Sequence, residues 1–186
     1  MKKNAARTKA LAVASDLFYA NGVRAVGMEL IVEKSGIAKT TIYRHFPTKD
    51  DLIEAFLEKE DDEFWSQWDE ITGDQPSATP ALDALCDWIA GRVCRDGYRG
   101  CPQINVAAEF ADPQHPARLV ARRHKAEMHR RLSRICARSG TPNPDQHAMQ
   151  IALLFDGAFM SDGRLTPFDA RKLLKDAVHR MIGTPA

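Results

Sequence analysis

The chain has 186 residues, of which 44% are hydrophobic and 27% are charged. This composition is ordinary for a folded domain, and the length is sufficient to bury a core without disulfides. A disordered chain, a collagen-like repeat and a small disulfide scaffold are therefore excluded. The formal net charge is +1.

The hydrophobic pattern is helical throughout, because no stretch shows sustained alternation with a period of two. Clusters of glycine, proline and asparagine separate the periodic segments, for example at Asn21-Gly22. In chain order, the predicted helices span about 4–20, 28–35, 39–46, 48–71, 80–95, 102–110, 117–138, 145–160 and 167–182. The pattern predicts an all-α protein with about nine helices and short connections.

The charges are segregated along the chain. Residues 1–50 hold nine basic and four acidic residues, whereas residues 51–75 hold one basic and ten acidic residues. A basic head is therefore followed by an acidic helix, which favours a domain boundary near Pro47. We expect a head of residues 1–47 and a second region of residues 48–186.

The sequence also suggests the compartment. The strongest apolar run, residues 149–155, is interrupted by Gln150 and is far shorter than the ~20 residues that cross a bilayer. The cations at the N-terminus are not followed by an apolar stretch, because Arg7 and Lys9 intervene. No signal peptide is expected, so we predict a cytoplasmic protein without a membrane partner.

The four cysteines form no C-x-x-C pair, and no histidine stands at a zinc-site spacing from them. We therefore expect reduced thiols, no metal site and no cofactor. Cys101 lies just before a predicted helix start, where the helix dipole lowers the pKa of a thiol, and redox sensing is a second hypothesis for it.

Two short predicted helices meet at Ser35-Gly36-Ile37. Gly36 suits the left-handed backbone of a tight turn between helices. The second helix carries cations, hydroxyls, a phenol and an imidazole within about two turns: Lys39, Thr40, Thr41, Tyr43, Arg44 and His45. Side chains of this kind can bind base edges and phosphates in a major groove.

The stretch from about Arg7 to Leu57 resembles the DNA-binding domain of the TetR family of bacterial repressors. The resemblance rests on Leu17-Phe18, Asn21-Gly22, the run from Glu33 to Phe46, Lys49 and Leu52. It implies an N-terminal three-helix helix-turn-helix domain, residues 1–47. It also implies a C-terminal helical domain for effector binding and dimerisation, residues 48–186, with the helix from about 48 to 71 as the connector.

The resemblance implies DNA-binding roles for individual residues. Lys39, Thr40 and Tyr43 match positions that approach bases, and Thr41, Tyr43, His45 and Lys49 match positions near phosphates. Arg44 belongs to the same polar face. Core packing is an alternative for Tyr43 and Phe46, and capping or space filling is an alternative for His45.

Two residues depart from the family pattern. Gly27 stands where the family usually has a serine or threonine N-cap, and glycine caps only weakly. Glu29 stands where a cation is common, and its carboxylate repels phosphate but can accept a hydrogen bond from cytosine N4. We include Glu29 among the DNA-binding residues, and the operator sequences of relatives are not expected to transfer simply to this chain.

The family resemblance implies a homodimer built on the last two long helices. The helix at 145–160 is apolar on more than one face, which indicates burial on more than one side. The candidate interface residues are Met149, Leu153, Gly157, Met160, Leu174, Val178 and Met181. The alternative is that both helices only complete the core of a monomer.

The resemblance also implies an effector cavity within the C-terminal helices. Apolar walls with a few polar groups are typical of small-molecule pockets. The candidates are Trp88, Asn105, Phe110, His124, Met128, Phe155 and Phe159. For each of them, simple packing is the alternative.

Common catalytic motifs are absent from the sequence, including Walker, G-x-S-x-G and H-E-x-x-H patterns. An enzyme is therefore not expected. The resemblance implies a ligand-responsive transcriptional repressor that a small-molecule effector releases from a palindromic, double-stranded operator. The alternative is an activator or a ligand-independent DNA binder with the same fold.

Overall fold

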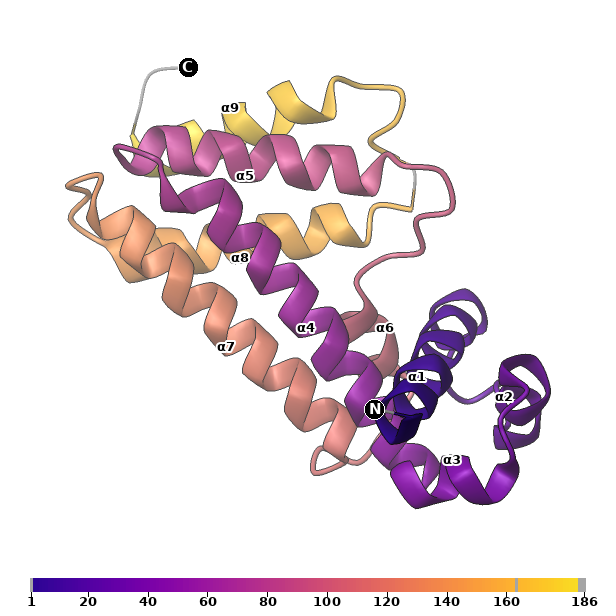
Figure 1. Cartoon of the computed structure of the whole chain (residues 1–186). Helices are drawn as coiled ribbons and strands as arrows, with labels where there is room; N and C mark the ends of the chain where they lie inside the picture. Colours follow the sequence, from indigo (N-terminus) through magenta and orange to yellow (C-terminus); the bar gives the residue numbers. More distant parts are fainter. Residues whose placement is uncertain (1, 163, 184–186) are drawn as a thin grey trace. The chain divides into compact units, whose positions relative to one another are not determined.

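The computed structural model describes residues 2–162 and 164–183. These residues form nine helices and no strand, as the hydrophobic pattern predicts (Figure 1). The helices are α1 Lys2–Asn21, α2 Met28–Ser35, α3 Lys39–His45, α4 Lys49–Gly73, α5 Ala78–Val93, α6 Pro102–Ala108, α7 Pro116–Ala137, α8 Pro144–Phe159 and α9 Ala170–Ile182. The all-α prediction is confirmed.

The chain divides into two compact units. The head unit comprises Met1–Asp62 and Pro102–Arg122, and the C-terminal unit comprises Glu63–Cys101 and Arg123–Ala186. The head unit therefore contains α6 and the start of α7 in addition to the first three helices. These units differ from the division at residue 47, which separates the chain by function and stays a prediction.

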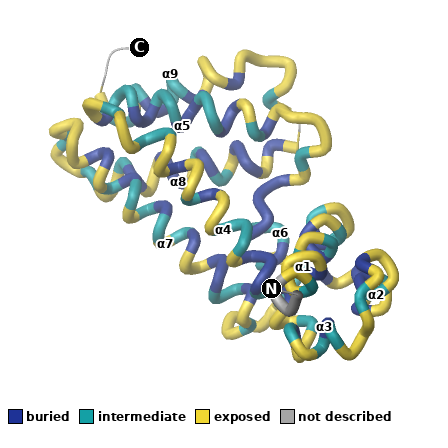
Figure 2. Tube along the Cα trace, viewed as in Figure 1, coloured by how far each residue is buried: buried dark blue, intermediate teal, exposed yellow. Residues whose placement is uncertain are grey.

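The core of the head unit is formed by the apolar faces of α1, α2 and α3 and by the start of α4. On α1, Ala14 and Phe18 are four residues apart and both are buried. Ile31 of α2 and Ile42 of α3 are fully buried, and the rings of Phe18 and Phe56 lie 5.8 Å apart between centroids. On these helices buried residues alternate with exposed ones (Figure 2), and the buried side fixes the rotation of each helix.

A reciprocal capping arrangement starts α4. The Thr48 hydroxyl accepts a hydrogen bond from the backbone N–H of Asp51 at 3.1 Å, and the Asp51 carboxylate accepts one from the N–H of Thr48 at 2.8 Å. This capping box satisfies backbone donors that a helix start would otherwise leave without partners. It explains why α4 begins at Lys49, directly after Thr48.

The C-terminal unit is a helical bundle in which α5, α8 and α9 pack against one another. Leu85 and Ile89 of α5 and Phe155 of α8 are fully buried. The α9 helix starts at Ala170, three residues after the expected position, because the Asp169 side chain caps it by accepting from the N–H of Lys172 at 3.1 Å. None of the described helices has the length and hydropathy of a membrane span.

Candidate nucleic-acid interface

The turn between α2 and α3 has the geometry that the glycine predicts. Gly36 has φ +64°, and its N–H donates to the carbonyl of Val32 at 3.0 Å. The Ser35 hydroxyl also donates to this carbonyl, at 3.3 Å, and accepts from the N–H of Ile37 at 3.3 Å. A Cβ at position 36 would meet nothing within 4 Å, so the left-handed backbone alone requires glycine there.

The α3 helix turns its polar residues away from the core. Ile42 is its fully buried anchor. Lys39, Thr40 and Arg44 are exposed, whereas Thr41, Tyr43 and His45 are partly buried. The six predicted α3 residues therefore lie on one short helix, and three of them are exposed.

Tyr43 and His45 are held more closely than their neighbours. Tyr43 packs against the core of the head unit, and the Lys39 ammonium lies 5.8 Å from the centre of its ring. The Nε2 atom of His45 is buried and has no hydrogen-bond partner among the described residues. A nitrogen buried in this way is less accessible to a phosphate than an exposed ammonium is, and the phosphate contact of His45 stays a prediction.

Glu29 of α2 forms an ion pair with the first residue of α3. Lys39 Nζ donates to Glu29 Oε1 at 3.1 Å, and the two side chains are 57% and 76% exposed. The hydrogen bond from Lys39 lowers the pKa of Glu29, and its counterpart raises the pKa of Lys39. Both groups are therefore charged at neutral pH, and the ion pair spans the turn between the two helices.

Lys49 is the first residue of α4 and is partly buried. The helix start beside it also holds two carboxylates, because Asp51 belongs to the capping box and Asp50 Oδ2 lies 3.5 Å from His115 Nε2. A phosphate at this helix end would be attracted by the Lys49 ammonium and repelled by these acids. The phosphate contact of Lys49 stays a prediction, and it would depend on the side chain more than on the helix dipole.

A residue far along the chain fixes the loop between α1 and α2. The Glu109 carboxylate, just after α6, accepts from the backbone N–H of Val23 at 3.0 Å and of Arg24 at 2.8 Å. Gly22 has φ +84°, and a Cβ there would lie 3.1 Å from Glu109 Oε1. The Arg24 guanidinium lies 5.3 Å from the centre of the Phe110 ring. No local sequence pattern signals this contact, and we did not predict it.

Comparison with known proteins supports the helix-turn-helix assignment. Residues 10–56 match the family described as bacterial regulatory proteins, tetR family. Residues 10–56 are therefore a helix-turn-helix segment of the TetR type.

Relatives within the family share different amounts of the chain. The HTH-type transcriptional repressor KstR2 of Rhodococcus jostii (strain RHA1) is 29% identical over 45% of this chain and 41% of its own length. An HTH-type transcriptional regulator of Staphylococcus aureus (strain USA300) is 30% identical over 41% of this chain and 42% of its own length. The matches thus span less than half of these two curated relatives.

A solved structure extends the likeness to nearly the whole fold. The TetR-family transcriptional regulator SCO4454 from Streptomyces coelicolor is 29% identical and superposes with a TM-score of 0.84. The alignment covers 96% of this chain and 92% of that chain. The C-terminal helices therefore also follow a TetR-family architecture.

The predicted effector residues are divided between the two units. Asn105 and Phe110 belong to the head unit, where the Phe110 ring stacks on His115 with 3.7 Å between centroids. The other five belong to the C-terminal unit: Trp88, His124, Met128, Phe155 and Phe159. A pocket lined by all seven is not described by the structure.

The C-terminal unit contains an aromatic cluster around Phe64. The ring of Phe64 lies 4.9 Å from those of Trp88 and His124 and 6.1 Å from that of Phe159. Trp88 Nε1 also donates to Gln67 at 3.1 Å. Three predicted effector residues are thus packed on Phe64, which is not among the predicted effector residues. Their effector contacts stay a prediction.

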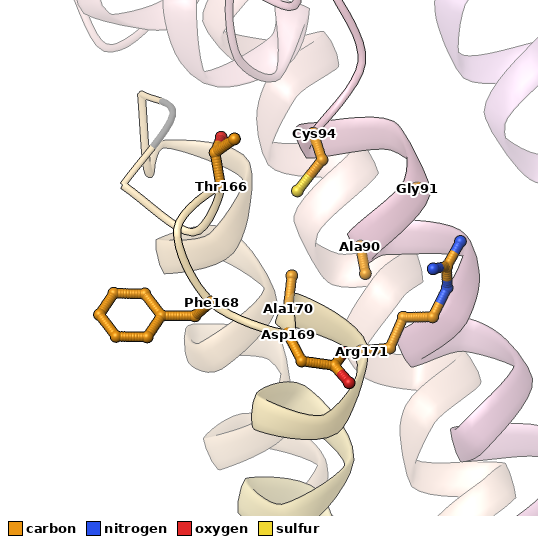
Figure 3. A pocket seen from close by; sticks show the side chains of 8 residues that line it. All are labelled: Ala90, Gly91, Cys94, Thr166, Phe168, Asp169, Ala170 and Arg171. Carbon is orange, nitrogen blue, oxygen red and sulfur yellow. The ribbon is translucent and has the colours of Figure 1, made fainter.

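A hollow of about 370 Å³ lies between the end of α5 and the segment that leads into α9 (Figure 3). Cys94, Thr166, Phe168 and Arg171 are among its lining residues, and none of the predicted effector residues lines it. Within the described residues, no cluster of histidine, cysteine, aspartate or glutamate could hold a metal ion.

The predicted dimer residues divide into two sets. On α8, Met149, Leu153 and Met160 are 46%, 64% and 39% exposed, although all three are large and apolar. On α9, Leu174 and Val178 are 1% and 0% exposed. They therefore pack in the core of the subunit and are not accessible to a second subunit. The exposed residues Gly157 and Leu173 complete the two helix faces, and Met181 is partly buried.

The correction for α9 has a simple geometric reason. Its buried stripe consists of Ala170, Leu174 and Val178, which repeat every four residues. The apolar residue beside this stripe, Leu173, is 42% exposed. From the sequence, Leu173 and Leu174 are equivalent, and only the rotation of the helix in its bundle distinguishes the inner from the outer residue.

Proposed function

We propose that this chain is a transcriptional regulator that binds double-stranded DNA through α3. It acts as a homodimer on a palindromic operator, and a small-molecule effector releases it, so that its role is repression. The observation that carries the proposal is the exposed polar face of α3, anchored by Ile42 and braced by α2 across the turn at Gly36.

The side chains on the exposed face of α3 support DNA binding. A recognition helix places a few side chains against base edges while others hold phosphates. Lys39 and Arg44 supply cations at the two ends of α3, and Thr40 supplies a hydroxyl between them. Operator affinity should consequently fall steeply as salt concentration rises, because bound cations release counterions from the duplex.

The apolar face of α8 supports the dimer. Met149, Leu153, Gly157 and Met160 recur at intervals of three or four residues, so they share one face of the helix. Large apolar side chains exposed together on one helix are typical of a contact surface. Two recognition helices related by a twofold axis would then read the two half-sites of a palindrome.

The name of the KstR2 relative supports repression, because that protein is a transcriptional repressor. Release by an effector requires that the effector binds the form with low DNA affinity better than the operator-bound form. An activator or a ligand-independent DNA binder would have the same α3 face. These alternatives differ in what happens after binding.

The decisive experiment starts from a random pool of duplexes selected on the purified full-length chain. We expect enrichment of a palindrome, and a dimer bound to it in analytical ultracentrifugation. A reporter driven from a promoter that carries this palindrome should be repressed, and a screen of small molecules should yield one that releases the chain. Selection without any enriched sequence would overturn the proposal.

A further inference from the structure

The ion pair between Glu29 and Lys39 lies on the surface that the proposed function turns toward DNA. Glu29 is the second residue of α2, and Lys39 is the first residue of α3. Their side-chain atoms meet at 3.1 Å across the turn. The Lys39 ammonium also lies 5.8 Å from the centre of the Tyr43 ring. Lys39 is therefore held between a carboxylate and an aromatic ring.

Folding stability does not account for this arrangement. Both side chains are more than half exposed, and exposed ion pairs contribute little to stability, because solvent screens them and ordering two long side chains costs entropy. A carboxylate also repels the phosphates of any duplex that approaches α3. The pair thus opposes indiscriminate DNA binding, since it neutralises Lys39 and adds a negative charge close to the backbone.

The pair is complementary to a particular base pair. In the major groove, G·C presents two adjacent acceptors on guanine and one donor, the N4 amino group of cytosine. The ion pair presents the complementary groups: the Lys39 ammonium can donate to the guanine acceptors, and the adjacent Glu29 carboxylate can accept from cytosine N4. In an A·T pair, the acceptor O4 of thymine stands in the place of the cytosine N4 amino group and would repel the carboxylate.

We infer that Glu29 determines the sequence specificity of the head by holding Lys39 for guanine, by accepting from cytosine N4 and by repelling non-specific duplexes. This inference rests on the proposed function and deepens it. It assigns Glu29 a positioning role toward Lys39 in addition to its own base contact. Each half-site should accordingly contain one G·C pair whose recognition depends on both residues.

The test compares the wild-type chain with Glu29→Gln, which removes the charge and keeps the size of the side chain. The matched control is Glu33→Gln, because Glu33 lies one turn further along α2, is exposed, and pairs with its neighbour Lys34 at 3.3 Å instead of with α3. Affinities for the selected palindrome and for a scrambled duplex are measured by fluorescence anisotropy at several salt concentrations. Thermal unfolding checks that all variants fold.

We expect Glu29→Gln to bind the scrambled duplex several-fold more tightly, with a salt dependence steeper by about one counterion per subunit, because Lys39 is released to phosphates. The ratio of palindrome to scrambled affinity should fall about fivefold to tenfold, as for one lost base contact. Replacing the G·C pair should weaken the wild-type chain and change the affinity of Glu29→Gln much less. Glu33→Gln should keep the wild-type ratio.

The outcomes separate the two proposals. If the wild-type chain prefers no palindrome, the proposed function fails and this inference fails with it. If the wild-type chain does prefer one but Glu29→Gln keeps the same affinity ratio, only the inference is overturned. An equal loss of ratio in Glu33→Gln would also overturn it, because the effect would then reflect the charge of α2 in general.

Discussion

The α3 face of the head unit and the α8 face of the C-terminal unit are both exposed, and they differ in almost every other respect. The α3 face carries Lys39, Thr40 and Arg44, whose charges and hydroxyls stay solvated in the free chain. The α8 face carries Leu153 and its apolar neighbours, which have no polar group to solvate. The first surface is suited to a charged polymer, and the second to another apolar surface.

Because of this difference, binding to DNA and assembly of the proposed dimer depend on different physical interactions. Contacts with phosphates weaken as salt rises, because the released counterions regain less entropy. Contacts between apolar faces depend on area removed from water and respond little to salt in this range. Assembly of the dimer and binding to DNA should therefore respond to different variables and can be broken one at a time.

The largest expected effect comes from salt itself. Raising the ionic strength about fourfold should lower operator affinity by about three orders of magnitude, if the dimer makes six or more phosphate contacts. Sedimentation velocity under the same conditions should show an unchanged dimer. Dissociation of the dimer over this range would break the comparison, because α8 association would then depend on charge.

Leu153→Asp should have the next largest effect. A carboxylate at a position that is 64% exposed in the single subunit leaves the subunit folded but must be desolvated in a dimer. We expect monomers in sedimentation and a loss of operator affinity of about 100-fold or more, since a single recognition helix reads only half a site. Ser66→Asp, at an exposed position of α4, is the control.

Lys49→Ala should have a smaller effect, confined to DNA. We expect operator affinity to fall about tenfold and the salt dependence to lose about one counterion per subunit, as for one phosphate contact. The Thr48–Asp51 capping box is untouched, so the melting temperature should stay close to that of the wild type. Lys172→Ala, an exposed lysine of α9, should change neither quantity. Unchanged binding by Lys49→Ala would remove this residue from the interface.

The smallest effect concerns charges that act inside the C-terminal unit. Glu127 accepts from Arg130 Nε at 2.7 Å and from Arg131 Nε at 2.6 Å, and these hydrogen bonds, that from Arg130 foremost, lower the pKa of Glu127 from 4.5 to about 2. Because the pKa of Glu127 is lower in the folded chain, its charge stabilises the fold at pH values above its ordinary pKa of 4.5. This stabilisation is lost as pH falls from about 4.5 toward 2.

Glu127→Gln should consequently flatten the pH dependence of the melting temperature between about pH 5 and pH 2, and lower the melting temperature at neutral pH by only a few degrees. Circular dichroism melts would measure both. Operator affinity at neutral pH should not change, because this charge is used within one subunit. A pH dependence as steep as that of the wild type would show that Glu127 does not contribute to it.

The sequence is sufficient to predict features that depend on residues close to one another along the chain. The turn at Gly36, the anchor Ile42 and the polar face of α3 all follow from local spacing, and family resemblance reinforced them. Glu109 was out of reach, since it contacts residues 85 and 86 positions away and nothing near it in sequence marks it as a partner. The orientation of Leu174 was missed for a related reason, because packing in the bundle decides it.

The contact of Glu109 has a consequence for building chimeric regulators. A head excised at residue 47 and grafted onto another family member would leave behind the acceptor for the amides of Val23 and Arg24. A recipient that lacks an acid at the matching position would leave these two amides without an acceptor and would loosen the loop between α1 and α2 in the grafted head. Exchange of specificities between relatives therefore calls for α6 and Glu109 to be transplanted together with the first three helices.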